Sequence, residues 1–98
     1  IGSSGGAAQI GSSGDSARIG SSGYDARIEL NGKDSVGMAA GPDSKIKGKL
    51  GCWITLSEWK LDGNRYIPLC VKSAQIDGKI LKEDTFYKLI DGEFVEAE

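Results

Sequence analysis

Histidine is missing from this 98-residue chain, and cysteine, proline and aromatic side chains are scarce. Without histidine, imidazole acid–base catalysis, Ser-His-Asp and Cys-His nucleophile pairs and most zinc sites are excluded. Two cysteines are too few for a disulfide framework. No apolar run approaches the ~20 residues that span a bilayer. The near balance of 12 basic and 14 acidic residues offers no electrostatic footprint for nucleic acid.

The residues that are abundant form a short-period repeat. Residues 1–45 are five consecutive copies of nine residues, the first three reading IGSSGGAAQ, IGSSGDSAR and IGSSGYDAR. The fifth position is always glycine: Gly5, Gly14, Gly23, Gly32 and Gly41. The first position is isoleucine in four copies, and the eighth is alanine or serine. Because a flexible linker would not keep these columns in register, the repeat predicts a β-solenoid.

Strand alternation gives the phase of the repeat. It points Ala17 and Ile19 inward and Arg18 outward, and Leu30 continues the inward set beside Ile28. The constant glycine is expected to turn the corner with a positive φ. Two copies, eighteen residues, suffice for one coil, so five copies predict about two and a half coils, or ~12 Å of rod at ~4.8 Å per stacked strand.

A calcium-binding β-roll, G-G-x-G-x-D-x-U-x, is the nearest nonapeptide template. Aligning its apolar U with Ile19 places its aspartate on Ala17, and the same slot holds Ala8, Ala26 and Ser35. The oxygen ligands that calcium requires are therefore missing. The sequence favours a metal-free solenoid, and we predict no cofactor.

The aromatic residues divide the chain. All except Tyr24 follow residue 50, which predicts a solenoid over residues 1–50 and a β-hairpin or meander cap over residues 51–98. Asp62-Gly63 is a strong hairpin signal between two runs of β-formers. This turn would pair Trp59 with Tyr66, Leu56 with Leu69 and Ile54 with Val71.

Two further Asp-Gly steps extend the cap. Asp77-Gly78 and Asp91-Gly92 are hairpin signals, and the second would place Leu89 opposite Phe94 and Tyr87 opposite Glu96. Together with the first hairpin they predict an all-β chain that ends in an antiparallel meander.

Lysines and cysteines are interpreted structurally. Lys45, Lys47 and Lys49 alternate outward, which favours an exposed edge kept soluble by lysine over a phosphate-binding patch. Cys52 and Cys70 lie on opposite faces of the predicted hairpin, so we predict two free thiols. Free thiols favour the cytoplasm of a bacterial host, although the sequence does not fix the location.

The order of these motifs resembles a known class of proteins. IGSSG-x-x-A-R copies run into G-x-W-I-T-L-x-E-W-K, then R-Y-I-P-L-C-V-K, D-T-F-Y-K-L and D-G-E-F-V-E. The chain resembles the C-terminal part of uncharacterised nonapeptide-repeat β-solenoid proteins of bacteriophages and gut bacteria. Because the family carries more repeats and a separate N-terminal domain, the resemblance implies a C-terminal fragment. It supplies no catalytic residue.

The function that the sequence favours is a non-enzymatic structural or interaction module, a repeat rod with an aromatic-rich cap. Aromatic and arginine side chains dominate protein interfaces, so the candidate partner-binding residues are Arg18, Arg27, Trp53, Trp59 and Tyr66. Arg18 and Arg27 are one repeat apart and are expected on one repeating face, and Tyr87 is a further candidate among the aromatic residues. An open solenoid end is an unpaired sheet edge. Residues Ile1 and Ile10 on that edge predict end-to-end association of two chains.

Three alternatives follow from the same residues. The resemblance leaves open a phage-encoded inhibitor of a host defence or host enzyme that acts by protein binding. Ice binding is disfavoured because the array has no threonine, since Thr55 and Thr85 lie in the cap. Catalysis is disfavoured because acidic pairs such as Glu83 and Asp84 fall in predicted turns, where nothing buries them.

Overall fold

The computed structural model describes residues 2–3, 9–12 and 18–97. The described residues form ten β-strands and no helix, which confirms the predicted all-β class. No helix in these ranges is long and apolar enough to cross a membrane.

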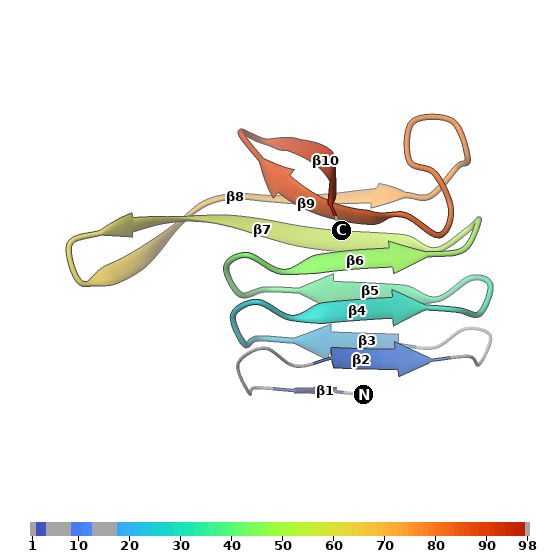
Figure 1. Cartoon of the computed structure of the whole chain (residues 1–98), viewed down its shortest axis with the longest axis horizontal. Helices are drawn as coiled ribbons and strands as arrows, with labels where there is room; N and C mark the ends of the chain where they lie inside the picture. The colour runs from blue at the N-terminus through green and yellow to red at the C-terminus, as the bar shows by residue number, and fades with distance from the viewer. Residues whose placement is uncertain (1, 4–8, 13–17, 98) are drawn as a thin grey trace.

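Two five-stranded mixed sheets make up the fold (Figure 1). The first sheet contains, in spatial order, β1 (Gly2–Ser3), β3 (Arg18–Ser21), β5 (Val36–Ala39), β7 (Trp53–Asp62) and β8 (Arg65–Gln75). The second sheet contains, in spatial order, β10 (Glu93–Ala97), β9 (Phe86–Ile90), β6 (Lys45–Gly48), β4 (Arg27–Leu30) and β2 (Gln9–Ser12). Strands from the repeat array pair in parallel, and the C-terminal hairpins add antiparallel strands.

Parallel neighbours are eighteen residues apart in the array. Arg18 lies opposite Val36 in the first sheet, and Arg27 lies opposite Lys45 in the second. Consecutive nine-residue copies therefore lie in opposite sheets. The first half of β7 continues this parallel ladder against β5 before the strand enters a hairpin. The division of the chain at residue 50 stays a prediction.

The core lies between the two sheets and follows the predicted strand phase. From β3 onward the inward columns are fully or almost fully buried, whereas Arg18 and Arg27 are exposed. The buried side chains are Ile19, Ile28 and Ile46 at the first repeat position and Ser21, Leu30 and Ala39 at the third, and β7 continues these columns one residue early with Ile54 and Leu56. Large and small residues are matched across the core. A Cβ at Gly37 would lie 3.0 Å from Leu30 Cδ1, and one at Gly48 would lie 3.0 Å from Ile76 Cδ1.

At the described corners between β3 and β6, aspartate and not the constant glycine adopts the left-handed conformation, whereas Gly51, with a φ of 89°, adopts it at the corner before β7. Asp25, Asp34 and Asp43 have φ values of 53°, 56° and 59°, a region that aspartate and asparagine enter more readily than most residues. Gly41 is needed for a different reason, because a Cβ there would overlap the carbonyl oxygen of Gly23 in the corner stacked on it. The prediction of a positive φ at this glycine is therefore wrong.

The β7–β8 hairpin turns one residue later than predicted. Gly63 and Asn64 are the two turn residues, flanked by the pair Asp62 and Arg65. Gly63 has a φ of 65°, and glycine with positive φ at the first central position is typical of a type II′ turn. The Asp-Gly step thus marked the hairpin, but its aspartate belongs to the strand.

A register shift between Glu58 and Trp59 changes the pairing further. Leu69 is the extra residue of this β-bulge, because Glu58 pairs with Cys70 and Trp59 with Pro68. The predicted register is therefore wrong. The observed pairs are Trp59 with Pro68, Leu56 with Lys72 and Ile54 with Ala74.

The β9–β10 hairpin matches its prediction. Asp91 and Gly92 form the turn with φ values of 52° and 77°, the two positive values that a type I′ turn requires. Leu89 lies opposite Phe94, as predicted. The predicted pair Tyr87 and Glu96 is also observed.

Asp77-Gly78 makes a loop and not a hairpin. The Asp77 carboxylate accepts hydrogen bonds from the backbone N–H groups of Lys79, Ile80 and Leu81, at 2.8, 3.0 and 3.3 Å. These bonds lower the pKa of Asp77, and the hydrogen bond from the backbone N–H of Lys79 has the largest effect. The predicted single meander is wrong, because the loop carries the chain from β8 in one sheet to β9 in the other.

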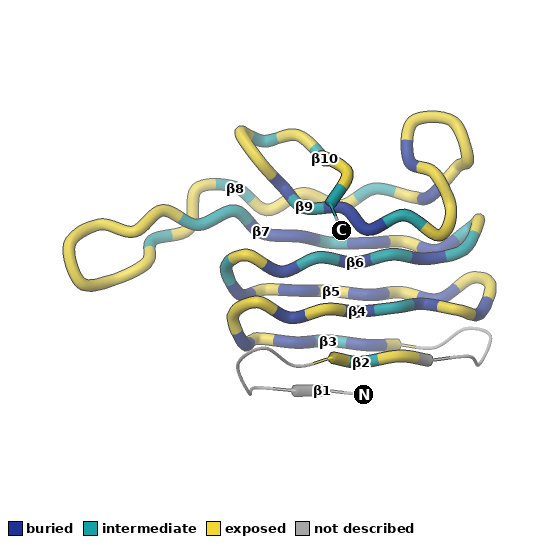
Figure 2. The backbone as a smooth tube through the Cα atoms, viewed as in Figure 1, coloured by how far each residue is buried: buried dark blue, intermediate teal, exposed yellow. Residues whose placement is uncertain are grey.

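Both hairpins lie at the same end of the stack, but they extend differently. The β7–β8 hairpin runs well beyond the other strands as a two-stranded arm (Figure 1). Its projecting part is largely exposed, whereas the strands of the stack alternate between buried and exposed positions (Figure 2).

Candidate functional site

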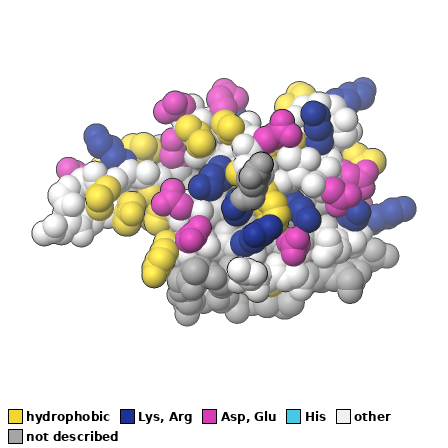
Figure 3. Space-filling view, in the orientation of Figure 1, with side chains coloured by type: hydrophobic (Ala, Val, Ile, Leu, Met, Phe, Trp, Pro, Cys, Tyr) yellow, Lys and Arg dark blue, Asp and Glu magenta, His cyan; other side chains and the backbone are white. Residues whose placement is uncertain are grey.

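The outward residues of the two sheets differ in chemistry. In the second sheet the exposed or half-buried outward positions of β4 and β6 are charged: Arg27, Glu29, Lys45 and Lys47. Figure 3 shows basic and acidic side chains interspersed over β6 and β9 on the side nearest the viewer. In the first sheet the outward positions of β5 and the start of β7 are instead Val36, Met38 and Trp53.

Three cationic side chains on the outer side of the second sheet pack over one aromatic ring, that of Phe86. The Arg27 guanidinium lies 4.5 Å from the centroid of Phe86, and the Lys47 and Lys45 ammonium groups lie at 5.1 and 5.7 Å. These are cation–π distances. Lys47 also pairs with Glu29 at 3.0 Å. The cationic groups here therefore pack on the protein's own ring, which gives a structural reason for their presence.

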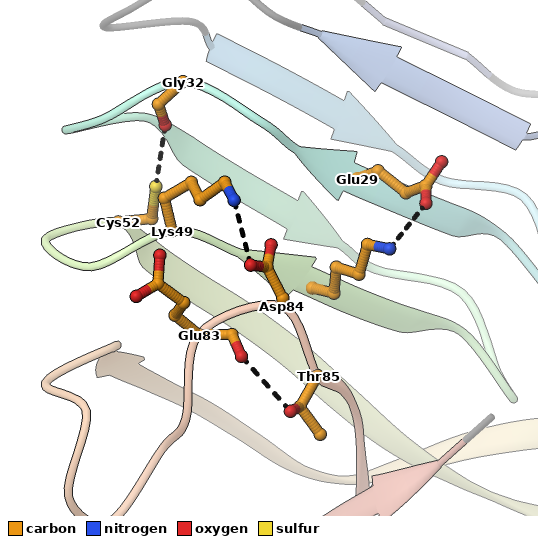
Figure 4. Close-up of polar contacts among 8 residues, drawn as sticks. Glu29, Gly32, Lys49, Cys52, Glu83, Asp84 and Thr85 are labelled. Atoms are coloured by element: carbon orange, nitrogen blue, oxygen red, sulfur yellow. Dashed lines mark hydrogen bonds and ion pairs between the residues drawn. The ribbon is translucent and has the colours of Figure 1, made fainter.

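Lys49 and Asp84 make a second internal ion pair. Lys49 Nζ donates to Asp84 Oδ2 at 2.9 Å (Figure 4), and this bond is the main cause of the raised pKa of Lys49. β6 is also not an edge strand, because it pairs with β4 and β9. The prediction that its lysines protect an exposed edge is therefore wrong.

The outer side of the first sheet carries large apolar side chains that remain exposed. Six of them, from β5, β7 and β8, expose between 38% and 65% of their surface. We call these residues the apolar face: Val36, Met38, Trp53, Leu61, Tyr66 and Val71.

Strand pairing explains why these residues share one side. Leu61 lies opposite Tyr66 and Val71 opposite Ser57. Thr55 and Ser73 are also paired, and their hydroxyl oxygens lie 2.7 Å apart, which marks the same outward side. The charged residues of the hairpin alternate to the opposite side. Those residues are Glu58, Lys60, Asp62, Arg65 and Lys72.

A shallow hollow of about 150 Å³ lies within the apolar face, between Met38, Val71 and Trp59. Trp59 forms one wall because its Nε1–H donates to the Ala40 carbonyl oxygen at 2.8 Å and to Ser57 Oγ at 2.9 Å. These two bonds fix the half-buried indole against the sheet. The hollow has room for one aliphatic side chain.

The opposite side of the β7–β8 hairpin is tied to the second hairpin. The Glu58 carboxylate accepts N–H bonds from Asp91 at 2.6 Å and Gly92 at 3.0 Å. Lys72 Nζ donates to the Gly92 carbonyl oxygen at 3.0 Å. We call Glu58 and Lys72 the latch, because they hold the Asp91-Gly92 turn and leave the apolar face uncovered.

Removing the latch carboxylate is expected to loosen the β9–β10 hairpin. Glu58→Ala deletes two charge-assisted bonds, worth about 1.5–3 kcal/mol, so hydrogen exchange at the Gly92 amide should accelerate by about tenfold or more. NMR-detected exchange measures this. Glu96→Ala, an exposed position on β10, is the matched control. Equal acceleration in both variants would show that the latch is not specific.

The predicted partner-binding residues are treated as two groups, the aromatic residues and the two arginines, and the aromatic residues lie on or next to the apolar face. Trp53 and Tyr66 belong to the apolar face, and Trp59 borders it. Tyr87, a further aromatic considered from the sequence, is 3% exposed, and its hydroxyl accepts the N–H of Lys82 at 2.7 Å. Partner binding by these residues stays a prediction.

Arg18 and Arg27 do not form one repeating surface. Arg18 lies on β3 in the first sheet and Arg27 on β4 in the second, so the idea that they share a face is wrong. One nine-residue step crosses from one sheet to the other. Of the proposed self-association edge, Ile10 is half-buried on β2, the terminal strand of its sheet. Ile1 lies outside the described residues.

Three residues of the apolar face were not predicted as binding residues from the sequence: Val36, Met38 and Val71. Part of the signal was present for the array, because Val36 follows Arg18 by eighteen residues on the neighbouring strand of the same sheet, and reading the outward residues every eighteen positions separates Val36 from the charged set that contains Arg27 and Lys45. The step from Val36 to Trp53 is one residue shorter, at seventeen, and Val71 depends on the register of the β7–β8 hairpin.

Both cysteines are free, as predicted. Cys52 is buried, and its thiol donates to the Gly32 carbonyl oxygen at 3.2 Å (Figure 4). Ser35 Oγ makes the equivalent bond to the same carbonyl oxygen at 3.3 Å. Cys52 therefore occupies the place of the eighth repeat residue, and Cys70 packs partly against the core.

Comparison with known proteins gives no match among family models, curated proteins or solved structures. Across residues 2–3, 9–12 and 18–97, no group of three or more histidine, cysteine, aspartate or glutamate side chains is placed to hold a metal ion.

Proposed function

We propose that this chain is a non-enzymatic structural module that binds a protein through the apolar face. The observation that carries the proposal is the contrast between the two outer sides of the fold. One carries cationic side chains packed over Phe86, with two exposed apolar side chains, Ile90 and Val95, and the other leaves six large apolar side chains in solvent. Exposed apolar patches rimmed by polar residues mark protein interaction sites in soluble proteins.

The architecture that presents this face is proposed to be a β-solenoid of nine-residue repeats, two per coil. Support comes from parallel pairing between strands eighteen residues apart and from the buried columns at the first and third repeat positions. The hairpins would close one end of the rod. Such a rod positions a binding face rigidly, which suits a scaffold.

Candidate acidic groups have structural partners, which supports a non-enzymatic role. Both carboxylate oxygens of Glu58, which borders a pocket with Asp43 and Lys88, are used by the Asp91-Gly92 turn. Asp84 is paired with Lys49. A general acid or base needs a carboxyl that can reach a substrate, and these groups are occupied by the fold.

Site-specific photocrosslinking tests the proposed function. A benzophenone amino acid replaces Val71 on the apolar face, and a matched variant carries it at Ile80, which is 84% exposed in the loop after β8. After irradiation in bacterial cells, we expect a discrete crosslinked product from position 71 and none from position 80, with the product identified by mass spectrometry. No discrete product from position 71, or identical products from both, would refute binding by the apolar face.

A further inference from the structure

The size of the apolar face suits association between two protein copies. The six side chains expose 38–65% of their surface, and aromatic side chains present ~150–250 Å² each, so together they expose on the order of 600 Å². A stable interface buries about 800 Å² per partner. With the intervening Thr55, Ser73 and Trp59 included, the face reaches this range.

Charge makes a second copy the fitting partner. Among the described strands, the charged residue on the side of the apolar face is Arg18, on β3 beside Val36. The charged residues of β7 and β8 alternate to the other side, where Glu58 and Lys72 lie. A partner selected by charge would need complementary charge, and this face offers little. Its chemical complement is another neutral apolar sheet face, and two copies can meet there without opposing like charges.

We propose that two copies of this chain associate by packing their apolar faces against each other. The inference rests on the proposed function and names the partner for the same site. The two faces then meet as sheets pack in a β-sandwich, ~10 Å apart. The hollow bordered by Met38, Val71 and Trp59 receives a side chain from the other copy.

The free edge of β8 favours face packing over strand addition. β8 is the terminal strand of its sheet and contains Pro68 opposite Trp59. Proline has no N–H to donate, and proline and charged residues on an edge oppose pairing with another strand. Arg65 and Lys72 on the same strand add charge. The edge of β8 is therefore protected against pairing with a strand of another molecule, whereas the apolar face remains exposed to a second copy.

Sedimentation equilibrium of the purified full chain tests the inference. We expect concentration-dependent dimerisation to twice the 10.3 kDa of the chain, with a dissociation constant on the order of 10 µM. Val71→Lys, at a 65% exposed position, should weaken the dimer by about thirtyfold, since it puts a charge at the centre of the face. The matched control Ile80→Lys should leave the dissociation constant unchanged.

Circular dichroism shows whether each variant is folded, and Met38→Lys on β5 provides a second variant if Val71→Lys is not. A wild-type chain that stays monomeric at about 500 µM would overturn the inference. So would a dimer that is insensitive to both lysine variants, which would point to pairing at the β1 and β2 edges instead. Equal weakening by Ile80→Lys would show non-specific association.

The crosslinking experiment separates this inference from the proposed function. A position-71 product that contains only this chain supports both. A product that contains a different protein, with a purified chain that is monomeric, overturns self-association and leaves the proposed function standing. No product together with a monomeric chain overturns both.

Discussion

Gly41→Ala is expected to lower the free energy of unfolding by about 3 kcal/mol or more. The added Cβ would overlap the Gly23 carbonyl oxygen and lie 2.9 Å from the Tyr24 nitrogen. Both are backbone atoms, so the clash is relieved only by separating two stacked corners. That separation would strain the adjacent bond from the Asp25 N–H to the Pro42 carbonyl oxygen, now 2.7 Å.

Thermal unfolding measures the effect of Gly41→Ala. A loss of this size lowers the melting temperature of a chain of this length by about 12 °C or more. The matched control is Gly20→Ala, because a Cβ at Gly20 meets nothing within 4 Å, and its effect should stay within about 0.5 kcal/mol. If the two variants melt together, the glycine column is not required by corner stacking.

The second large effect is expected at the centre of the core. Leu30 is fully buried between the sheets, and Leu30→Ala should destabilise the chain by about 2–5 kcal/mol through lost apolar burial and the cavity that remains. Chemical denaturation monitored by tryptophan fluorescence gives the change in free energy, with Trp53 and Trp59 as reporters on β7.

A double-mutant cycle tests whether Leu30 and Gly37 form a matched pair. Gly37→Ala alone places its Cβ 3.0 Å from Leu30 Cδ1, so Leu30 must shift and stability falls. In the Leu30→Ala background the same methyl group enters the cavity and should recover about 1 kcal/mol or more. Strictly additive effects would mean that the two positions adjust independently.

The part of the fold that repeats was the part the sequence could predict. Alternation around Arg18 correctly assigned Ile19 and Leu30 to the core, because each column supplies several examples of the same environment. The Asp91-Gly92 hairpin was also predictable in register, since both turn residues suit positive φ. These features depend on local backbone preference and on strand alternation alone.

The first hairpin shows why local signals were not sufficient. Asp62, Gly63 and Asn64 contain two overlapping turn signals, and single-residue displacement of the turn changes every cross-strand pair. The bulge at Leu69 then changes the register again. Nothing near Leu69 in the sequence distinguishes a bulged strand from a regular one, because the bulge depends on how β7 and β8 twist together.

The candidate site was hidden by a difference between two periods. The sequence repeats every nine residues, whereas neighbours in a sheet recur every eighteen. Arg18 and Arg27 therefore looked like one surface although they lie on different sheets. The corner aspartates were also missed, because the positive φ was expected at the constant glycine, whereas Asp25 and Asp34 adopt it.

Because consecutive nine-residue copies lie in opposite sheets, it matters whether an odd or an even number of copies is inserted. Duplicating one nine-residue unit upstream of Val36 would move every earlier outward residue to the other side of the molecule relative to the two hairpins. Arg18 would then share a side with Phe86, and Arg27 would share a side with Trp53. Duplicating eighteen residues would lengthen the stack and keep each residue on its side. Repeat number can therefore change freely only in pairs if the surface pattern is to be preserved.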